Sequence, residues 1–427
     1  MDISAVHSLF LECSSISIDT RKIEENSMFI ALKGDRFDAN TFAKEALQKG
    51  AAYVIIDNPD YFIDERTIVV PDSLKALQEL SQYHRTFLGL PIIALTGSNG
   101  KTTTKEVITK VLAMKFNVTS TIGNLNNHIG VPLTLLSFTK KTEIGIVEMG
   151  ANHQEEIAFL CNLAKPDYGY ITNFGKAHLE GFGGIEGVIK GKSEMYDYLR
   201  INKKIVFINL DDAIQVKQSQ AITSYTFGAR NPHADVSIDS ITANPLVAIA
   251  YKGISINSHL IGLYNANNIN AALTIGVFFK ISDTDIKLAL ENYIPENNRS
   301  QLISKNTNTI ILDAYNANPS SMKVAIENFL QLENTNKILV LGDMFELGTD
   351  SKKEHQHIVN MLLNSNSISC YFIGKAFHEN KIEKNNFSFH ETFDGFSNDF
   401  SKIQLNDASI LIKGSRGMAL ERTLELI

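Results

Sequence analysis

The sequence lacks several features that would assign it to common classes of protein. It has only three cysteines, Cys13, Cys161 and Cys370, which lie far apart in mainly apolar surroundings. Their separations match no metal-ligand spacing. We therefore expect buried free thiols.

Long apolar runs and blocks of basic residues are missing too. No stretch approaches the length that spans a membrane, and the start M-D-I-S-A has neither the basic residues nor the apolar run of a secretory signal. The net charge is −7, so a nucleic-acid partner has no electrostatic support. No internal repeat or low-complexity tract is visible. These absences predict a cytoplasmic protein with no membrane or nucleic-acid partner.

The length and composition predict several ordinary folded domains. The chain has 427 residues, of which 44% are hydrophobic and 20% are charged. This balance is typical of globular proteins, and the length is large for one core. We expect two or three domains.

Residues 94–104, A-L-T-G-S-N-G-K-T-T-T, are the most informative stretch. An apolar run precedes them and a pattern of helical spacing follows, which predicts a strand, a tight loop and a helix start. Glycines let backbone N–H groups face an anion, and Lys101 and Thr102 add a cation and a metal-binding hydroxyl. The general phosphate-loop pattern would need glycine where Leu95 stands, so this is a shortened T-G-x-x-G-K-T loop. A plain glycine turn is the alternative, which the joint presence of these features disfavours.

Apolar strands alternate with amphipathic helices from about residue 91 to 295. Strands are predicted at 92–96, 116–120, 143–148, 168–172 and 205–209, with shorter β segments and hairpins between 224 and 260. The alternation predicts a mostly parallel sheet with helices on both faces, which binds ligands at the carboxyl ends of its strands.

Two strand ends in this region carry candidate ligands. Glu148 ends one strand beside the expected phosphate site, and the segment from Asn173 to His178 follows another. Glu148 is a candidate metal ligand, although acidic residues at strand ends also cap helices. A single histidine such as His178 is more often a core or surface residue than a ligand.

Two helical segments contain residues that are candidates for binding. Residues 187–196 carry Lys190 and Lys192, which surface exposure alone would explain. Residues 262–272 open a helix with more asparagines than capping needs, and the surplus amides could contact a base edge.

The two ends of the chain predict separate α/β units. Before residue 88 we expect strands at 17–21, 27–32, 52–56 and 67–70 and helices at 40–49 and 73–87. The polar clusters at 19–21 and 33–40 could bind a ligand or simply face solvent. After a composition shift at 295–298, strands are predicted at 309–313, 337–341, 369–373, 387–390 and 409–412, with helices such as 321–332 and 352–363. This second doubly wound unit has no phosphate loop, so any nucleotide must be shared across the domain cleft.

With these residues assembled, the chain resembles the Mur ligase family, which forms amide bonds in peptidoglycan precursors at the expense of ATP. The loop 96–103 matches that family and is shared with folylpolyglutamate synthetases. Other similar stretches lie at 19–21, 31–40, 123–132, 313–322, 341–348, 413–416 and 420–421. The resemblance implies three α/β domains: a UDP-binding domain at 1–88, a central P-loop domain with a parallel sheet at 89–296, and a Rossmann-like domain that binds the incoming dipeptide at 297–427.

The resemblance also implies a reaction. The stretches at 313–322 and 341–348 are similar to those of the family members that use UDP-N-acetylmuramoyl-tripeptide and D-alanyl-D-alanine. ATP would phosphorylate the terminal carboxylate of the tripeptide, and the dipeptide amine would attack the acyl phosphate, leaving ADP. Catalysis would rest on positioning and charge neutralisation.

The resemblance assigns roles to individual residues. Lys101 would contact the transferred phosphate, Thr102 and Glu148 would hold one Mg²⁺, and His178 with carbamylated Lys192 would hold a second. The other ATP-binding candidates are Gly97, Ser98, Asn99, Gly100, Thr103, Asn268, Arg299 and Asp313. The substrate-binding candidates are Thr20, Arg21, Lys33, Asn124, Asn127, His128, Tyr315, Asn316, Asn318 and Arg416.

Three alternatives remain open. A sister ligase would add one amino acid at the third peptide position, but it usually carries an Asp-Asn-Pro-Arg motif where this chain has D-A-Y-N-A-N-P. A folylpolyglutamate synthetase lacks the N-terminal UDP-type domain. A nucleotide-binding module would form no amide bond at all. The sequence does not indicate the third residue of the peptide or the oligomeric state, and a monomer is the default expectation.

Overall fold

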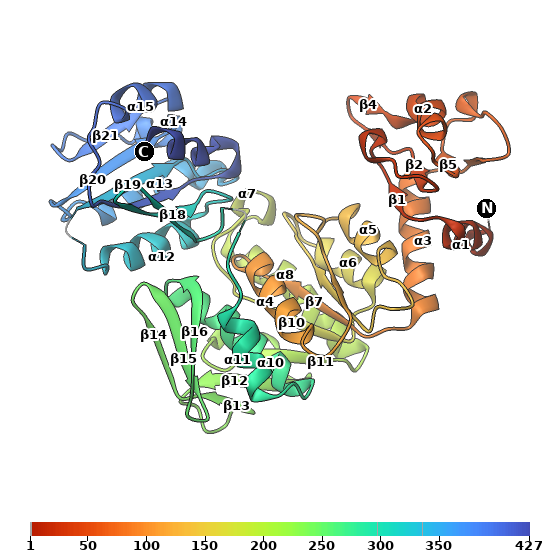
Figure 1. Ribbon diagram of the computed structural model, residues 1–427, viewed down its shortest axis with the longest axis horizontal. Helices are drawn as coiled ribbons and strands as arrows, with labels where there is room; N and C mark the ends of the chain where they lie inside the picture. Colours follow the sequence, from red (N-terminus) through yellow and green to blue (C-terminus); the bar gives the residue numbers. More distant parts are fainter. Residues whose placement is uncertain (1, 297, 335) are drawn as a thin grey trace.

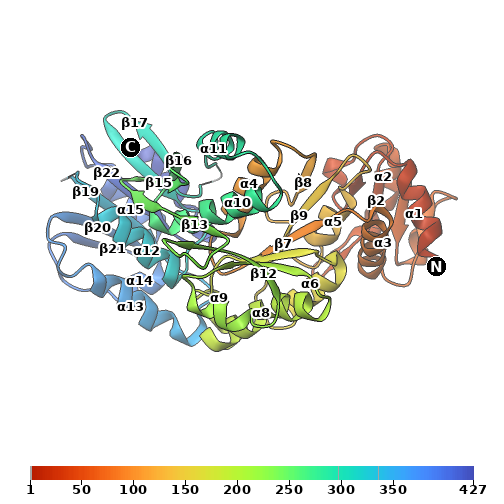
Figure 2. The same ribbon diagram turned by 90° about the horizontal axis from the view of Figure 1, so that it is seen from below.

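The computed structural model describes residues 2–296, 298–334 and 336–427. Three α/β units follow one another, with the N-terminal unit at one end of the molecule and the C-terminal unit at the other (Figures 1 and 2). Met1 and residue 297, where two of the expected domains begin, lie outside the described residues. No helix of the described part is long and apolar enough to cross a membrane.

The N-terminal unit is a small parallel sheet in the order β1-β2-β5-β6. Its strands are β1 (Ile16–Ser17), β2 (Met28–Ile30), β5 (Tyr53–Ile56) and β6 (Thr67–Val69), and its α-helices are α1 (Ile3–Glu12), α2 (Ala43–Gln48) and α3 (Ser73–Leu88).

Helix α1 was not predicted; Asp2 caps it by accepting a hydrogen bond from the Ser4 N–H. The predicted strand at 17–21 is wrong beyond Ser17, because the Asp19 carboxylate accepts from the Arg21 N–H and starts a 3-10 turn over Thr20–Lys22. A short hairpin, β3 (Lys33–Gly34) and β4 (Phe37–Asp38), extends from this unit.

Helix α3 joins the N-terminal unit to the centre. It ends at Gly89, whose φ of +64° is a left-handed conformation that glycine adopts without strain. On the side facing the central unit, the buried Arg85 guanidinium donates to the Ala164 carbonyl at 2.9 Å and to Asp167 at 3.0 Å. These contacts connect the two units through a rigid element.

A buried histidine pair lies at the same junction. His7 Nε2 is 2.9 Å from His84 Nδ1, and His84 Nε2 is 2.8 Å from the Phe138 carbonyl of the central unit. Because a carbonyl can only accept, His84 carries a proton on Nε2, and its Nδ1 faces Nε2 of His7. Burial lowers the pKa of both histidines, to about 4 for His7, which favours the neutral form of each ring.

Stability should fall as the pH falls from 6.5 towards 4. In this range the unfolded chain protonates His7, with a pKa near 6.5, whereas the folded chain does not until about pH 4. The unfolded state therefore binds more protons, and the free energy of unfolding decreases with decreasing pH. Urea unfolding of His7→Phe should show a shallower pH dependence across this window than the natural chain. The exposed His233 supplies the control, since His233→Gln should leave the dependence unchanged.

The central unit is built on a seven-stranded sheet in the order β13-β12-β11-β10-β7-β9-β8, in which every neighbouring pair is parallel. Its strands are β7 (Ile92–Thr96), β8 (Val118–Ser120), β9 (Ile144–Glu148), β10 (Tyr168–Ile171), β11 (Ile205–Asn209), β12 (Thr223–Ala229) and β13 (Val236–Ile238). The five strands predicted before residue 210 are confirmed to within two residues at each end. Strand order reverses at β7, which places the phosphate loop at a topological switch point.

Helices cover both faces of this sheet. On one face lie α4 (Lys101–Leu112), α10 (Ala266–Phe278) and α11 (Asp283–Glu291), and on the other lie α5 (Gly130–Leu136), α6 (Glu156–Ala164) and α8 (Ile185–Ile201). Successive residues of β7 point to opposite faces: Ile92 and Ala94 pack in one core, and Ile93 and Leu95 in the other. Burial on both sides explains the continuous apolar run.

The β segments after residue 223 divide between two sheets. Strands β12 and β13 extend the parallel sheet, whereas β14 (Ser240–Ala243), β15 (Leu246–Tyr251) and β16 (Ile254–Ile261) form an antiparallel sheet of their own. The predicted hairpins are therefore confirmed for the second group only.

The C-terminal unit has a six-stranded sheet in the order β17-β18-β22-β19-β20-β21. Its strands are β17 (Gln301–Lys305), β18 (Asn308–Asp313), β19 (Lys337–Gly342), β20 (Ile368–Ile373), β21 (Phe387–His390) and β22 (Ser409–Lys413), and its α-helices are α12 (Pro319–Leu330), α13 (Ser351–Met361), α14 (Lys375–Glu379) and α15 (Phe393–Phe400). The predicted strands are confirmed. The antiparallel edge strand β17 was not predicted, since its burial alternates and it lacks the apolar run of the inner strands.

Candidate active site

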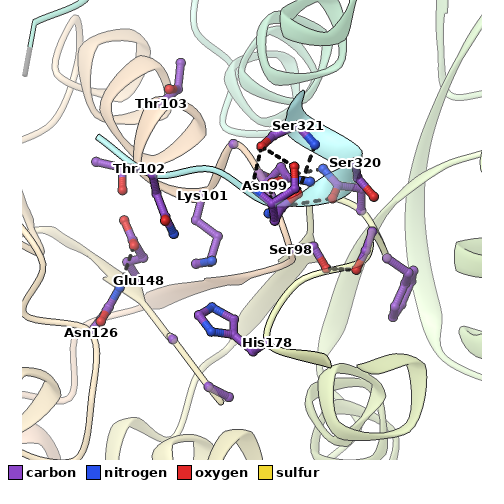
Figure 3. Close-up of a pocket in the computed structure, with 18 of the residues that line it drawn as sticks. Ser98, Asn99, Lys101, Thr102, Thr103, Asn126, Glu148, His178, Ser320 and Ser321 are labelled. Atoms are coloured by element: carbon purple, nitrogen blue, oxygen red, sulfur yellow. Dashed lines mark hydrogen bonds between the residues drawn. The ribbon is translucent and has the colours of Figure 1, made fainter. Parts of the chain in front are cut away.

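A cavity of about 1100 Å³ lies between the central and C-terminal units. Its walls include the phosphate loop, the ends of β9 and β10, the start of α10 and the first residues after β18. Figure 3 shows Lys101 and His178 facing the same space, with Thr102 beside Glu148. The predicted ATP-binding and metal-binding residues that line it are Ser98, Asn99, Gly100, Lys101, Thr102, Thr103, Glu148, His178, Asn268, Arg299 and Asp313.

The phosphate loop has the backbone that its glycines predict. Gly97 has a φ of +144°, and a Cβ there would lie 1.9 Å from Thr172 Oγ1. Gly100 has a φ of +77°, and a Cβ there would lie 2.8 Å from Asn268 Oδ1. A side chain at either position would displace the loop, and α4 begins directly afterwards at Lys101.

The end of β10 holds this loop in place. The Ser98 hydroxyl donates to the Gly175 carbonyl at 2.7 Å, and the Asn99 carbonyl accepts from the Thr172 hydroxyl at 2.6 Å. The Asn99 N–H donates to Asn173 Oδ1 at 3.1 Å. The cradle is therefore preorganised by side chains that follow the neighbouring strand.

Lys101 folds back over the loop that it follows. Its Nζ donates to the Gly97 carbonyl at 2.8 Å. Burial lowers the pKa of Lys101, while the nearby Glu148 carboxylate opposes that shift. The ammonium therefore lies where it can exchange this carbonyl for a phosphate oxygen.

Glu148 has one oxygen held and one oxygen free. Its side chain is buried, and Oε1 accepts from Asn126 Nδ2 at 2.8 Å. Oε2 is buried and has no hydrogen-bond partner among the described residues. A buried carboxylate oxygen without a partner is costly unless a cation or donor satisfies it. This atom and the Thr102 hydroxyl are hard oxygen ligands of the kind that Mg²⁺ prefers.

The described residues contain no group of three or more His, Cys, Asp or Glu side chains arranged to hold a metal ion by themselves. This agrees with the way in which Mg²⁺ is usually bound, through one or two carboxylates together with substrate phosphates and water. The donors at Glu148 and Thr102 thus fit a metal that arrives with a nucleotide.

His178 lies on the opposite side of the space from the phosphate loop and has a φ of +52°. Its Nδ1 is in direct contact with Glu346 Oε2 of the C-terminal unit. Burial lowers the pKa of His178, the Glu346 carboxylate raises it, and Lys101 and Lys192 lower it. The two lysines therefore lie close enough to affect this ring.

Lys192 is a buried amine on α8. Only 1% of the residue is exposed, and its Nζ lies 5.3 Å from the centre of the Phe182 ring. Burial lowers its pKa well below the usual value, with a further contribution from Lys101. No ion pair of Lys192 occurs in the part of the chain that the structure describes. Lys190, two residues earlier, is exposed to solvent.

Asn268 belongs to a chain of side-chain hydrogen bonds beside the cavity. Its Oδ1 accepts from the Thr104 hydroxyl at 2.9 Å, and its Nδ2 donates to Asn265 Oδ1 at 2.7 Å. Asn265 in turn donates to the Ile261 carbonyl at 2.8 Å. The amide plane of Asn268 is therefore fixed between α4 and the turn that precedes α10.

The C-terminal unit contributes charged groups after the linker. The Arg299 guanidinium lies 3.5 Å from the centre of the Tyr315 ring, and that of Arg416 lies 5.5 Å away. Asp313, at the end of β18, pairs with the buried Lys413 at 2.5 Å and accepts from the Ser300 N–H at 3.2 Å. These groups are held before any ligand binds.

The same unit contacts the phosphate loop directly. Asn318 Nδ2 donates to Asn99 Oδ1 at 2.7 Å, and the Lys176 N–H donates to the Ser320 hydroxyl at 2.8 Å. Lys176 Nζ also pairs with Glu354 at 2.6 Å. Asn318 Oδ1 meanwhile caps α12 by accepting from the Ser321 N–H at 2.9 Å. Both ends of this predicted substrate-binding amide are thus engaged within the protein.

The remaining predicted residues divide into two groups. Asn124, Asn127, His128, Tyr315 and Asn316 line the cavity. Six predicted residues do not line it: Gly97 of the phosphate loop, Lys192 of α8, Arg416 of the C-terminal unit, and Thr20, Arg21 and Lys33 of the N-terminal unit.

The N-terminal candidates form their own polar surface. The exposed Arg21 pairs with Asp19 at 2.7 Å, and Lys33 pairs with Asp57 at 2.8 Å. Asn40 is fully buried and donates to both Asp38 and Asp57, at 2.6 Å and 2.8 Å. These pairs keep the charged groups of the two predicted clusters ordered at the surface.

Sequence reasoning missed several residues that the fold brings to the site. Asn126 orients Glu148, Lys413 neutralises Asp313, and Glu346 contacts His178. Lys105 is buried one turn after Lys101 and donates to the Thr121 carbonyl at 2.6 Å. Three of these residues, Asn126, Glu346 and Lys413, belong to the stretches 123–132, 341–348 and 413–416 that are similar to the family. No sequence pattern indicated where their side chains point.

Comparisons with known proteins match the whole arrangement. Three family models match in order: "Mur ligase family, catalytic domain" over residues 12–85, "Mur ligase middle domain" over 95–276 and "Mur ligase, glutamate ligase domain" over 298–416. The chain is 35% identical to the UDP-N-acetylmuramoyl-tripeptide--D-alanyl-D-alanine ligase of Bacillus subtilis, over 96% of this chain and 92% of that protein.

Solved structures agree with this match. The crystal structure of MurF from Acinetobacter baumannii is 29% identical, covers 99% of this chain and 97% of its own, and superposes with a TM-score of 0.85. That of the MurF ligase of Thermotoga maritima in complex with ADP is 26% identical, covers 98% and 97%, and also gives a TM-score of 0.85. Because the three family models match successive parts of the chain and the similarity to the Bacillus subtilis ligase covers 96% of it, the chain belongs to the Mur ligase family.

Proposed function

We propose that this chain joins D-alanyl-D-alanine to UDP-N-acetylmuramoyl-tripeptide, with cleavage of ATP to ADP, to form UDP-N-acetylmuramoyl-pentapeptide for peptidoglycan. The observation that carries the proposal is the similarity to a ligase of that name at 35% identity over 96% of this chain. The stretches at 313–322 and 341–348, which favour the dipeptide-adding ligase over its sister, both reach the interface with the central unit. UDP-linked precursors and ATP would place this activity in the cytoplasm.

The phosphate loop would bind ATP and align its γ-phosphate with the tripeptide carboxylate. A carboxylate is a poor acylating agent, and phosphorylation gives it a leaving group. Lys101 would exchange the Gly97 carbonyl for the transferred phosphate and neutralise its charge. Asn268 and Thr103, with the loop residues 97–100, would hold the nucleotide, and Arg299 and Asp313 would reach it from the C-terminal unit.

Two metal sites would flank the transferred phosphate. The free Oε2 of Glu148 and the Thr102 hydroxyl would hold one Mg²⁺, and His178 with carbamylated Lys192 would hold the other. Bound Mg²⁺ would neutralise phosphate charge during transfer. Support for Lys192 comes from its burial and lowered pKa, which favour the neutral amine that attacks CO₂ to form a carbamate and release a proton. The exposed Lys190 has no such environment.

The groups of the two substrates would bind to different units of the chain. We assign the UDP group to the N-terminal unit (1–88), through Thr20, Arg21 and Lys33, and the peptide to Asn124, Asn127 and His128 of the central unit (89–296). The dipeptide would contact Tyr315, Asn316, Asn318 and Arg416 of the C-terminal unit (297–427). The protein would act as a monomer. Because Asn318 already contacts the phosphate loop, its contribution would be to position the two units.

Phosphate release is expected only when both substrates are present with ATP and Mg²⁺. A coupled assay should show ADP formation with UDP-N-acetylmuramoyl-tripeptide and D-alanyl-D-alanine together, and mass spectrometry should show the pentapeptide product. Omitting either substrate should reduce the rate to background. Equal release without the substrates would indicate a nucleotide-binding module, and release with UDP-linked dipeptide and one amino acid would indicate the sister ligase.

A further inference from the structure

The C-terminal unit places one carboxylate against the central unit beside the proposed second metal site. Glu346 follows β19 on the segment 343–348, and its Oε2 contacts Nδ1 of His178. Both residues line the cavity. Neither the proposed reaction nor the resemblance gives Glu346 a role.

The segment that carries Glu346 is held firmly within the C-terminal unit. The buried Asp343 accepts from the Ala376 and Phe377 N–H groups, both at 2.9 Å. The Met344 N–H donates to Nε2 of the buried His355 at 3.0 Å, and the Phe345 N–H donates to the Ser415 hydroxyl at 3.0 Å. Three consecutive residues before Glu346 are thus fixed, so its position is set before any ligand binds.

Further contacts join this segment to the residues after His178. The Glu180 N–H donates to the Glu346 carbonyl at 3.5 Å, and a Cβ on Gly348 would lie 3.1 Å from the Glu180 Cβ. Glu346 itself has a φ of +61°, a conformation that non-glycine residues adopt only when their surroundings hold them there. The contact with His178 is therefore part of a defined interface between the units.

A carboxylate at Nδ1 determines which nitrogen of an imidazole can bind a metal. It accepts the Nδ1 proton, which leaves the lone pair on Nε2 available, and it raises the basicity of that nitrogen. Carboxylates in this position commonly orient metal-binding histidines. Since Glu346 belongs to the C-terminal unit, it can do this only while that unit is docked.

We propose that Glu346 is a positioning residue that orients His178 for the second metal ion and so makes that site depend on docking of the C-terminal unit. The inference rests on the proposed function, because it takes His178 as a metal ligand. It adds a residue from the other unit, which makes the metal site complete only in the docked arrangement.

The first test measures metal binding in place of turnover. Mn²⁺ would be titrated into the full-length protein saturated with ADP and followed by electron paramagnetic resonance. The natural chain should bind two Mn²⁺ ions, and Glu346→Gln should weaken one of them by about 10- to 100-fold while the other is unchanged. Glu346 is half exposed at its side chain, so the variant should fold with an unchanged melting temperature.

Glu354→Gln is the matched control, because Glu354 makes an ion pair with Lys176 across the same interface but does not contact His178. This variant should bind both Mn²⁺ ions as the natural chain does. Equal weakening in both variants would mean that docking alone matters, which would overturn the specific role of Glu346. Two unchanged sites in Glu346→Gln would overturn it as well.

The second test follows the histidine itself. In metal-free protein, ¹⁵N spectra should show His178, identified by its loss in His178→Gln, with its proton on Nδ1. Glu346→Gln should shift it towards a mixture of the two tautomers, and Glu354→Gln should not. An unchanged tautomer would contradict the proposal. If the natural chain bound no Mn²⁺ in the presence of ADP, the result would contradict the proposed ATP-dependent function itself. Failure of the Glu346 proposal alone would instead leave two Mn²⁺ ions bound to the natural chain.

Discussion

Lys101→Ala is expected to lower the rate of pentapeptide formation by about 10³-fold or more. The Lys101 ammonium is the cation at the phosphate loop, and its hydrogen bond to the Gly97 carbonyl at 2.8 Å shows that it reaches over the cradle. Without it the charge that develops on the transferred phosphate would lose its nearest side-chain partner. The coupled ADP assay with both substrates measures the loss.

The control for this prediction lies on the same helix. Lys110 is exposed near the end of α4, and Lys110→Ala removes a charge of the same sign away from the cavity. That variant should keep near-normal turnover, whereas near-normal turnover in Lys101→Ala would refute the assignment of Lys101. Equal melting temperatures of both variants would show that the fold is intact.

Lys192→Ala is expected to lower turnover by about 10²-fold, and added short-chain carboxylic acids should restore part of it. The variant loses the proposed carbamate, and acetate or propionate can occupy the vacated space and supply a carboxylate to the metal. The site is buried, so the acid must be small. The measurement is the initial rate as a function of acid concentration, compared with the natural chain in the same buffers.

Lys190→Ala separates this explanation from a general effect of the helix. Lys190 is exposed on α8, two residues from Lys192, and its loss should change neither the rate nor the response to acids. Rescue of Lys190→Ala in place of Lys192→Ala would move the modification to Lys190. Mass spectrometry at high CO₂ should also find a gain of one carboxyl group that Lys192→Ala lacks.

Much of the fold could be predicted because local patterns and tertiary environment agree. Strand β7 is apolar on both faces and lies inside a parallel sheet, so its continuous run identified it. The left-handed glycines of the phosphate loop likewise follow from local backbone needs. Prediction failed where a local polar contact changed the backbone, as at Asp19, or where burial alternates, as in the edge strand β17.

The sequence predicted which residues are candidate ligands in the site, but it did not predict which side chains hold those residues in place. The loop, Glu148 and His178 stand at strand ends, and parallel topology brings strand ends together. The choice of Lys192 over Lys190 agrees with their burial, which a helix pattern alone did not decide. The partners of these residues, namely Asn126 for Glu148 and Glu346 for His178, depend on side-chain directions that have no local signal.

The amino-acid sequence by itself determined the phosphate loop, the alternation of strands and helices in three units, and the family to which the chain belongs. These depend on backbone conformation and on apolar periodicity, which are properties of neighbouring residues. Only the tertiary structure decided which amide holds Glu148, which lysine is buried, and which carboxylate of the C-terminal unit meets His178. The two contacts join residues that are far apart in the chain, and their geometry is set by how the strands and the units pack together.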